Sequence, residues 1–268
     1  MHSDLFDICR ALRRRGIRVT LLSTGLLLHR YAEQITAHVN DVIVSLDGPP
    51  AVHDTIRRVP GAFTILQEGI RRLLEIDPAF PISARCVAQQ LNHGQLIQTA
   101  ACAQALGLRS ISFLAADLTS EAFNRPNGWP QLQQQQIALT PDQLDVLADQ
   151  FRQISQRWNG SGFVLESPDK LQRIIDHFSA HLGLCAPQSP RCNAPWTSAV
   201  VEADGSVRPC FFHPPIGSLK HLALSQILNG PQAIAFRHSL DVGSNPICQR
   251  CVCSLNWKRA GVQETSCS

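Results

Sequence analysis

Helices and strands alternate along the first 117 residues, and this alternation constrains the fold more than any other feature of the sequence. Apolar residues recur at helical spacing in four segments, namely 5–12, 28–39, 63–73 and 96–100. Each segment leads to a short run rich in β-branched or small apolar residues: IRVTLL, VIVSL, ISARCVA and SISFLA. Strands joined through helices pair in parallel, so the sequence predicts an α/β fold, either an open sheet or part of a barrel.

Three loops of this predicted sheet are candidate binding sites, because ligands of such folds gather beyond the carboxyl ends of the strands. They are STG at 23–25, SLDGPP at 45–50 and FLAAD at 113–117. The chain opens on a helix, and the strand that should lead into that helix is absent. We therefore expect an incomplete sheet.

The pattern changes after residue 117. A polar connection with several prolines and the run Gln133 to Gln136 is followed by a helix that Thr140, Pro141 and Gln143 begin as a capping box. Another helix begins at Ser167-Pro168, and cysteines, turns and short strands dominate from Cys185 onward. We expect a barrel part over 1–117, a linker with helices over 118–184, and a small cysteine-rich domain over 185–268.

Charge and hydropathy exclude two classes of partner. The chain has 24 basic and 21 acidic residues, a balance without the footprint of a nucleic-acid-binding protein. No apolar run reaches the length of a membrane span, and the start, MHSDLFDICRALRRRG, lacks the apolar core of a signal peptide. We expect a cytoplasmic protein with neither a nucleic-acid nor a membrane partner.

Ten cysteines are many for a cytoplasmic chain, where disulfides are rare and metal binding or catalysis is the usual explanation. Three of them follow apolar patterns: Cys9 and Cys102 on helices, and Cys86 in a strand. A thiol in such a place packs as a small apolar side chain. We expect these three to be structural.

Two cysteines flank a predicted β-hairpin in the stretch CNAPWTSAVVEADGSVRPC. The turn signal Asp204-Gly205 folds the hairpin and brings Cys192 and Cys210 together. The motif CQRC supplies Cys248 and Cys251, whose spacing lets both thiolates face one metal centre. Four thiolates suit either zinc or an iron-sulfur cluster, and the spacing does not choose between them. Further candidate ligands are Cys185, Cys253 and Cys267.

The sequence also resembles a known superfamily. The stretch VSLDGPPAVHDTIRRVPGAF is similar to the central strand and following helix of radical S-adenosylmethionine (SAM) enzymes, whose fold is a partial (β/α)6 TIM-like barrel. The stretches CNAPWTSAVVEADGSVRPC, GSLKHLALSQILNGPQAIAFR and CQRCVCSL resemble the SPASM/twitch extension of that superfamily, a small α+β domain that holds auxiliary four-iron clusters. Together these matches cover nearly the whole chain.

The resemblance implies cofactors and site residues. Cys192, Gly205 and Cys210 meet the pattern of cysteine, twelve residues, glycine, four residues and cysteine, and Cys248 with Cys251 supply its CxxC. It implies one auxiliary 4Fe-4S cluster, of the twitch type. It also implies that Ser45 and Asp47 meet the SAM ribose and that Thr24-Gly25 line the same site.

The chain departs from the superfamily at its start. The CxxxCxxC motif that binds the SAM-reducing cluster is not in the sequence, and neither is the GGE motif that follows it. Met1 to Leu5 resemble the residues after GGEPL, so we expect an amino-terminal truncation that removes about the first third of the barrel. The auxiliary cluster has four protein thiolates and no open iron site for SAM, so the chain alone should not cleave SAM.

Two functions of different class follow from these observations. The first is a radical SAM/SPASM enzyme that modifies or oxidises a peptide or a small molecule and takes electrons from a donor such as flavodoxin or ferredoxin. The second is a non-catalytic iron-sulfur or zinc-binding module. A nucleotide-binding α/β enzyme is a weaker alternative, because no Gly-rich phosphate loop follows any strand. No motif identifies catalytic residues, and we expect His53, His93 and His213 to be surface or packing histidines.

Overall fold

The computed structural model describes residues 2–122, 125 and 127–257. The chain divides into two compact units, one made of Met1–Ala116 with Ile137–Leu182 and the other of Asp117–Gln136 with Gly183–Ser268. We refer to them as the sheet unit and the cysteine unit.

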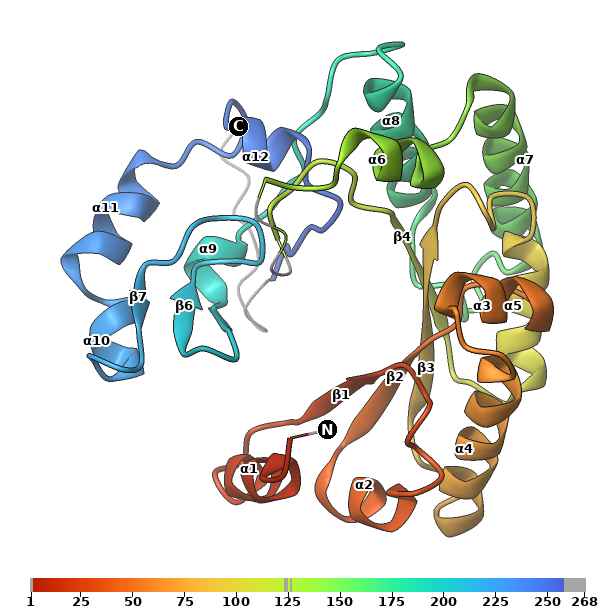
Figure 1. The fold of residues 1–268 in the computed structure, drawn as a ribbon, viewed down its shortest axis with the longest axis horizontal. Coiled ribbons are helices and arrows are strands. Elements are labelled where there is room, and N and C mark those ends of the chain that lie inside the picture. The colour runs from red at the N-terminus through yellow and green to blue at the C-terminus, as the bar shows by residue number, and fades with distance from the viewer. Residues whose placement is uncertain (1, 123–124, 126, 258–268) are drawn as a thin grey trace. The chain divides into compact units, whose positions relative to one another are not determined.

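The sheet unit is built on four parallel strands in the order β1 (Thr20–Ser23), β2 (Asp41–Ser45), β3 (Ile82–Ala88) and β4 (Ile111–Ala115) (Figure 1). Because the strands are joined through helices and follow the chain order, each connection crosses over in the same way. The predicted α/β parallel sheet is confirmed. Within it, Ser45 is the register partner of Arg85, and Arg85 is the partner of Ser112.

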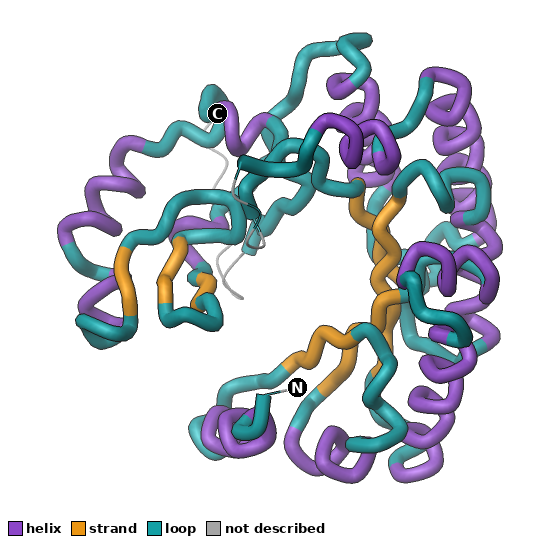
Figure 2. The backbone as a smooth tube through the Cα atoms, viewed as in Figure 1, coloured by secondary structure: helices purple, strands orange, loops and turns teal. Residues whose placement is uncertain are grey.

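Helices cover one face of this sheet (Figure 2). They are α1 (Leu5–Arg13), α2 (Ala32–His38), α3 (Pro50–Arg57), α4 (Ala62–Ile76), α5 (Leu96–Ala105), α7 (Pro141–Arg157) and α8 (Pro168–His181). The strand residues on the helix side are fully buried, as in Val42 and Val44 of β2 and Ala84 and Cys86 of β3. Alternate residues of β2 and β3 on the other side are only half-buried, and we call this side the open face of the sheet.

The segment 137–182 packs on the sheet, where the sequence analysis expected part of a linker. The helix α7 packs against α5, and α8 packs against β4. Phe163 and Leu165 exchange backbone hydrogen bonds with Ile111 at the edge of β4. The structural division therefore places residues 137–182 with the barrel part, because their apolar faces cover α5 and β4.

Several helices begin at the capping residues that the sequence predicts. The capping box of Thr140 and Gln143 is present at the start of α7, and the Ser167 hydroxyl accepts the Lys170 N–H at the start of α8. The stretch SLDGPP differs from a simple loop, because its last residue, Pro50, begins α3. The segment 28–31 forms turns, and α2 begins only at Ala32.

The cysteine unit contains short elements: α6 (Gln131–Ile137), α9 (Ala194–Thr197), β5 (Val200–Val201), β6 (Ser206–Arg208), β7 (Gly217–Ser218), α10 (Leu224–Leu228), α11 (Pro231–Ser239) and α12 (Pro246–Gln249). β5 and β6 form the predicted antiparallel hairpin around Gly205, which has a φ of 87°, and β7 adds a third strand. Four buried residues form its core: Val207, Ile216, Ile227 and Ala233.

Among the described helices, none combines the length and the apolar composition that crossing a bilayer requires.

Candidate functional site

Two of the four predicted thiols flank the hairpin. Cys192 precedes α9, and Cys210 follows the last residues of β6. The hairpin is held by the pairing of Val200 with Arg208 and of Val201 with Val207. This pairing returns the chain from β5 to β6, so the two cysteines stand on the same side of the turn.

The other two thiols come from α12 and the residue pair that follows it. The Asn245 side chain accepts the backbone N–H groups of Ile247 (3.0 Å) and Cys248 (3.2 Å), which fixes the start of this short helix. The Cys251 N–H donates to the Cys248 carbonyl at 3.2 Å. This hydrogen bond closes a turn between the two cysteines of the CQRC motif.

Asn193 joins the first cysteine segment to the segment that follows the last one. Its backbone N–H donates to the Leu255 carbonyl (2.7 Å), and its side chain both donates to the Trp257 carbonyl (2.7 Å) and accepts the Trp257 N–H (2.9 Å). The contact spans more than 60 residues of sequence. It brings Cys192 toward the region of Cys251, and no local signal in the sequence indicated it.

Cys192 and Cys210 lie within electrostatic range of each other and of both Cys248 and Cys251. Burial, followed by the charges of Cys210 and Cys192, raises the pKa of Cys248 to about 11. Burial is also the main cause that raises the pKa of Cys251, to which Cys253, Cys210 and Cys192 contribute. The pKa of Cys210 is raised by burial first, with a contribution from Cys192. Four thiols in a partly dry site are a donor set for a soft metal, which binds thiolates and displaces their protons.

Four cysteine thiols can serve either zinc or an iron-sulfur cluster, because both accept sulfur ligands. Within the described part of the chain, no three Cys, His, Asp or Glu side chains are grouped as the ligands of one metal ion are.

His213 lies against this set. Its Nε2 is 3.4 Å from the Cys248 Sγ, and the residue is 3% exposed. Its ring contacts the edge of Phe236, with 5.0 Å between the ring centroids. Burial lowers the pKa of His213, which favours the neutral ring. The expectation of a packing histidine is therefore met in part, since this one also contacts a candidate ligand.

The other cysteines are placed as follows. Cys9 and Cys86 are buried, as predicted, and Cys102 is half-buried on α5. Cys185 is exposed, and the Cys251 thiol donates to the Cys253 carbonyl at 2.8 Å. Cys267 lies outside the described residues.

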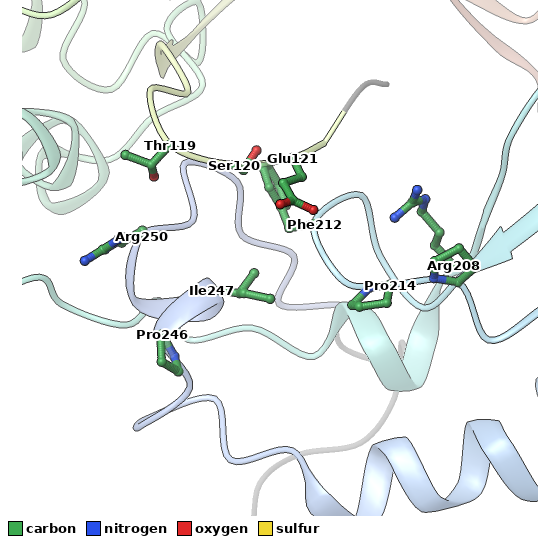
Figure 3. Close-up of a pocket in the computed structure, with 10 residues that line it drawn as sticks. Thr119, Ser120, Glu121, Arg208, Phe212, Pro214, Pro246, Ile247 and Arg250 are labelled. Carbon is green, nitrogen blue, oxygen red and sulfur yellow. The ribbon is translucent and has the colours of Figure 1, made fainter. Parts of the chain in front are cut away.

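A cavity of about 480 Å³ lies in the cysteine unit beside α12 (Figure 3). Its walls come from the segment 119–121, from the proline-rich turn after Cys210, and from α12 with Arg250. Arg208, Arg250 and Glu121 contribute charge, whereas Phe212 and Ile247 contribute apolar surface. The volume is within the range of small-molecule sites.

The sheet unit brings the other predicted site residues to the carboxyl ends of β1 and β2. Ser45 is half-buried on the open face of the sheet, and Thr24 is exposed. Gly25 has a φ of 90°, and a Cβ there would lie 2.4 Å from the Leu66 Cδ1, so only glycine fits. No described side chain hydrogen-bonds to the hydroxyls of Ser45 or Thr24, and both can contact a ligand.

The Asp47 side chain is bonded to other groups of the protein. Its side chain is 2% exposed, forms an ion pair with Arg57 through Oδ2, and accepts the Val87 N–H through Oδ1 at 3.2 Å. The Asn92 side chain donates to the Asp47 carbonyl (2.8 Å), and the Asp47 N–H donates to the His53 Nδ1 (3.2 Å). These contacts hold Asp47 in place directly beyond the end of β2.

Arg85 is a site residue that the sequence analysis missed. It neighbours Ser45 across the β2–β3 register, and its Nε donates to the Ser112 hydroxyl at 3.2 Å. The Glu166 carboxylate is close enough to interact with Arg85 electrostatically. The signal was the alternation in ISARCVA, where Ser83 and Arg85 fall on the face opposite Ala84 and Cys86.

A known protein family matches the part of the chain that contains these cysteines. The SPASM family, described as an iron-sulfur cluster-binding domain, matches residues 192–252. The match begins at Cys192 and ends one residue after Cys251, so it contains all four thiols of the set.

Two curated relatives share sequence with part of the chain. The AdoMet-dependent heme synthase of Methanosarcina barkeri is 35% identical over 107 residues, which is 39% of this chain and 30% of the relative. The protein of the same name from Oleidesulfovibrio alaskensis is 35% identical over 94 residues, which is 34% of this chain and 24% of the relative. The matches span less than a third of the length of these relatives.

Solved structures share the fold. The structure of anSMEcpe with bound AdoMet has a TM-score of 0.59 at 15% identity and covers 88% of this chain and 65% of its own. Streptococcus suis SuiB, bound to the precursor peptide SuiA, has a TM-score of 0.60 at 12% identity and covers 94% of this chain and 58% of its own. Residues 192–252 therefore match the SPASM iron-sulfur cluster-binding family, and the chain shares its fold with these structures.

Proposed function

We propose that the chain is part of a radical SAM/SPASM enzyme in which the cysteine unit holds one auxiliary 4Fe-4S cluster and the open sheet face binds SAM. The observation that carries this proposal is that the SPASM match contains four thiols, of which Cys192 and Cys210 interact electrostatically with both Cys248 and Cys251. Cys192, Cys210, Cys248 and Cys251 would be the ligands.

The sheet unit supports the SAM part of the proposal. Ser45 and Thr24 offer hydroxyls at the carboxyl ends of β2 and β1, where hydrogen bonds to ribose oxygens are possible, and Gly25 leaves room beside them. Arg85 offers a cation to a ligand carboxylate such as that of SAM. Asp47 acts indirectly, since its buried pair with Arg57 holds the strand end that carries Ser45.

The cofactors would carry the difficult chemistry, and the chain's residues would orient the ligands and exclude water. SAM, when bound and reduced in such enzymes, supplies radical chemistry on unactivated C–H bonds. The proposed substrate is a peptide or a small molecule: SuiB was solved with a precursor peptide, whereas the curated relatives are named heme synthases. An electron donor such as flavodoxin or ferredoxin completes the proposal.

Binding of radiolabelled SAM to the anaerobically reconstituted chain tests the proposed function. Equilibrium dialysis should detect SAM binding, and Ser45→Ala should weaken it roughly three- to tenfold, the loss expected for one hydrogen bond. Ser83→Ala is the matched control, because Ser83 is on the same sheet but bonds to Ser110 instead.

Two results would contradict the proposal. Equal SAM affinity in wild type and Ser45→Ala would show that the Ser45 hydroxyl does not bond to SAM. No SAM binding by a chain that holds its cluster would favour the alternative, a non-catalytic iron-sulfur module.

A further inference from the structure

His213 is placed to act on the proposed cluster without being one of its four cysteine ligands. It lies three residues after Cys210 in the sequence, yet its Nε2 contacts Cys248, which is 35 residues farther along. The N···S separation of 3.4 Å is that of a hydrogen bond to sulfur. The contact is buried, so water competes little for either partner.

Neighbouring groups hold the His213 ring in this orientation. Phe236 meets the ring at 66° with a centroid separation of 5.0 Å. The Arg208 Nη1 donates to the His213 carbonyl at 3.0 Å, and Arg208 is itself paired with Glu202. Backbone and ring are therefore both fixed before any metal binds.

The chemistry of the sulfur decides which group donates. A thiolate bound to iron carries no hydrogen and can only accept, whereas a neutral imidazole has one N–H. The contact in the loaded protein therefore requires the hydrogen on Nε2. Hydrogen bonds to the sulfurs are among the factors that set the reduction potential of an iron-sulfur cluster.

We infer that His213 donates an Nε2–H···Sγ hydrogen bond to the Cys248 thiolate and thereby raises the reduction potential of the auxiliary cluster. Reduction adds one electron to the cluster and makes its sulfurs more negative, so the hydrogen bond stabilises the reduced state more than the oxidised one. The proton stays on Nε2 throughout. This inference rests on the proposed function, because it requires a cluster at the four cysteines.

The test uses the whole chain, reconstituted anaerobically with iron and sulfide, and measures the midpoint potential by EPR-monitored titration. His213→Phe keeps a ring against Phe236 but removes the N–H, and the potential should become more negative. His213→Gln keeps an N–H donor and should lie between His213→Phe and wild type. His221→Phe, at an exposed histidine of the same unit, is the matched control and should leave the potential unchanged.

A second measurement requires no variant that has to fold. In wild-type protein labelled with ¹⁵N-histidine, pulsed EPR of the reduced cluster should show a weakly coupled nitrogen.

The outcomes separate this inference from the proposed function. If wild type holds no iron and sulfide, the proposed function fails. If wild type holds a cluster but shows no ¹⁵N coupling, or if a loaded His213→Phe has the wild-type potential, the role of His213 is refuted. A strongly coupled nitrogen, as for direct ligation to iron, would also refute it, because His213 would then be a ligand.

Discussion

The sheet unit and the cysteine unit differ in how much apolar core each has to stabilise its fold. The sheet unit buries continuous rows of apolar side chains between its strands and helices, including Val42, Val44, Leu66 and Ile70. Among its described residues, the cysteine unit has a core cluster of four buried side chains, with Leu228 and Phe236 packed against them, and short elements of two to nine residues. Burial can stabilise the first unit, whereas the second needs the additional links that a metal centre supplies.

The largest effect expected from this comparison is the loss of a cysteine ligand. Cys210→Ala or Cys251→Ala should abolish cluster uptake and unfold the cysteine unit, because metal binding and folding are coupled there. Hydrogen exchange should show lost protection over 200–257 and retained protection in β1 to β4. Cys102→Ala, on α5 of the sheet unit, should keep the iron content of wild type. Full iron retention in both ligand variants would refute the assignment.

Breaking the buried ion pair should produce the next largest effect, and it should fall on the sheet unit. Asp47→Ala leaves the Arg57 charge without its partner and the Val87 N–H without its acceptor. A cost of about 3–5 kcal/mol is expected in urea unfolding. Glu33→Ala removes an exposed pair with Arg72 and should cost less than about 1 kcal/mol. Similar costs for the two variants would contradict the role given to Asp47.

Removing the Asn193 side chain should weaken the cysteine unit by less. Asn193→Ala loses both side-chain hydrogen bonds to Trp257, a cost of about 1–3 kcal/mol. Iron occupancy after dialysis against a chelator should fall below that of wild type. Asn229→Ala, which loses one exposed bond to Ser225, is the control and should retain its iron. Equal iron retention in both variants would show that the Asn193 side chain does not help to hold the metal.

The smallest expected effect is on the pH dependence of the stability of the sheet unit. Burial raises the pKa of Glu166, so the folded state favours the protonated form. Its contribution to stability is therefore greatest below the unfolded pKa of about 4.3 and falls as pH rises through the folded value. Glu166→Gln should remove this dependence while an amide oxygen still accepts the Phe113 N–H. Unfolding curves that shift in parallel for both proteins between pH 4 and 7 would contradict this.

The sequence predicted those features that depend on neighbouring residues. The capping box of α7, the hairpin turn at Gly205 and the strand β3 follow from local patterns, and the structure confirms them. The CQRC motif likewise needs only four residues to be recognised.

Features that depend on distant residues were not predictable in the same way. The Asp47 carboxylate is buried because Arg57 and Val87 reach it, and Val87 is 40 residues away in sequence. Asn193 meets Trp257, and His213 meets Cys248, only after the chain has folded back on itself. Arg85 was within reach of pattern analysis, since strand alternation alone places it on the open face.

The iron and acid-labile sulfide content of the anaerobically purified chain tests the central claim most directly. The account predicts about four iron and four sulfide per chain, as expected for one 4Fe-4S cluster, and their loss in Cys210→Ala and Cys251→Ala. One zinc per chain without sulfide would contradict the cluster, and metal retained by both variants would contradict the ligand set.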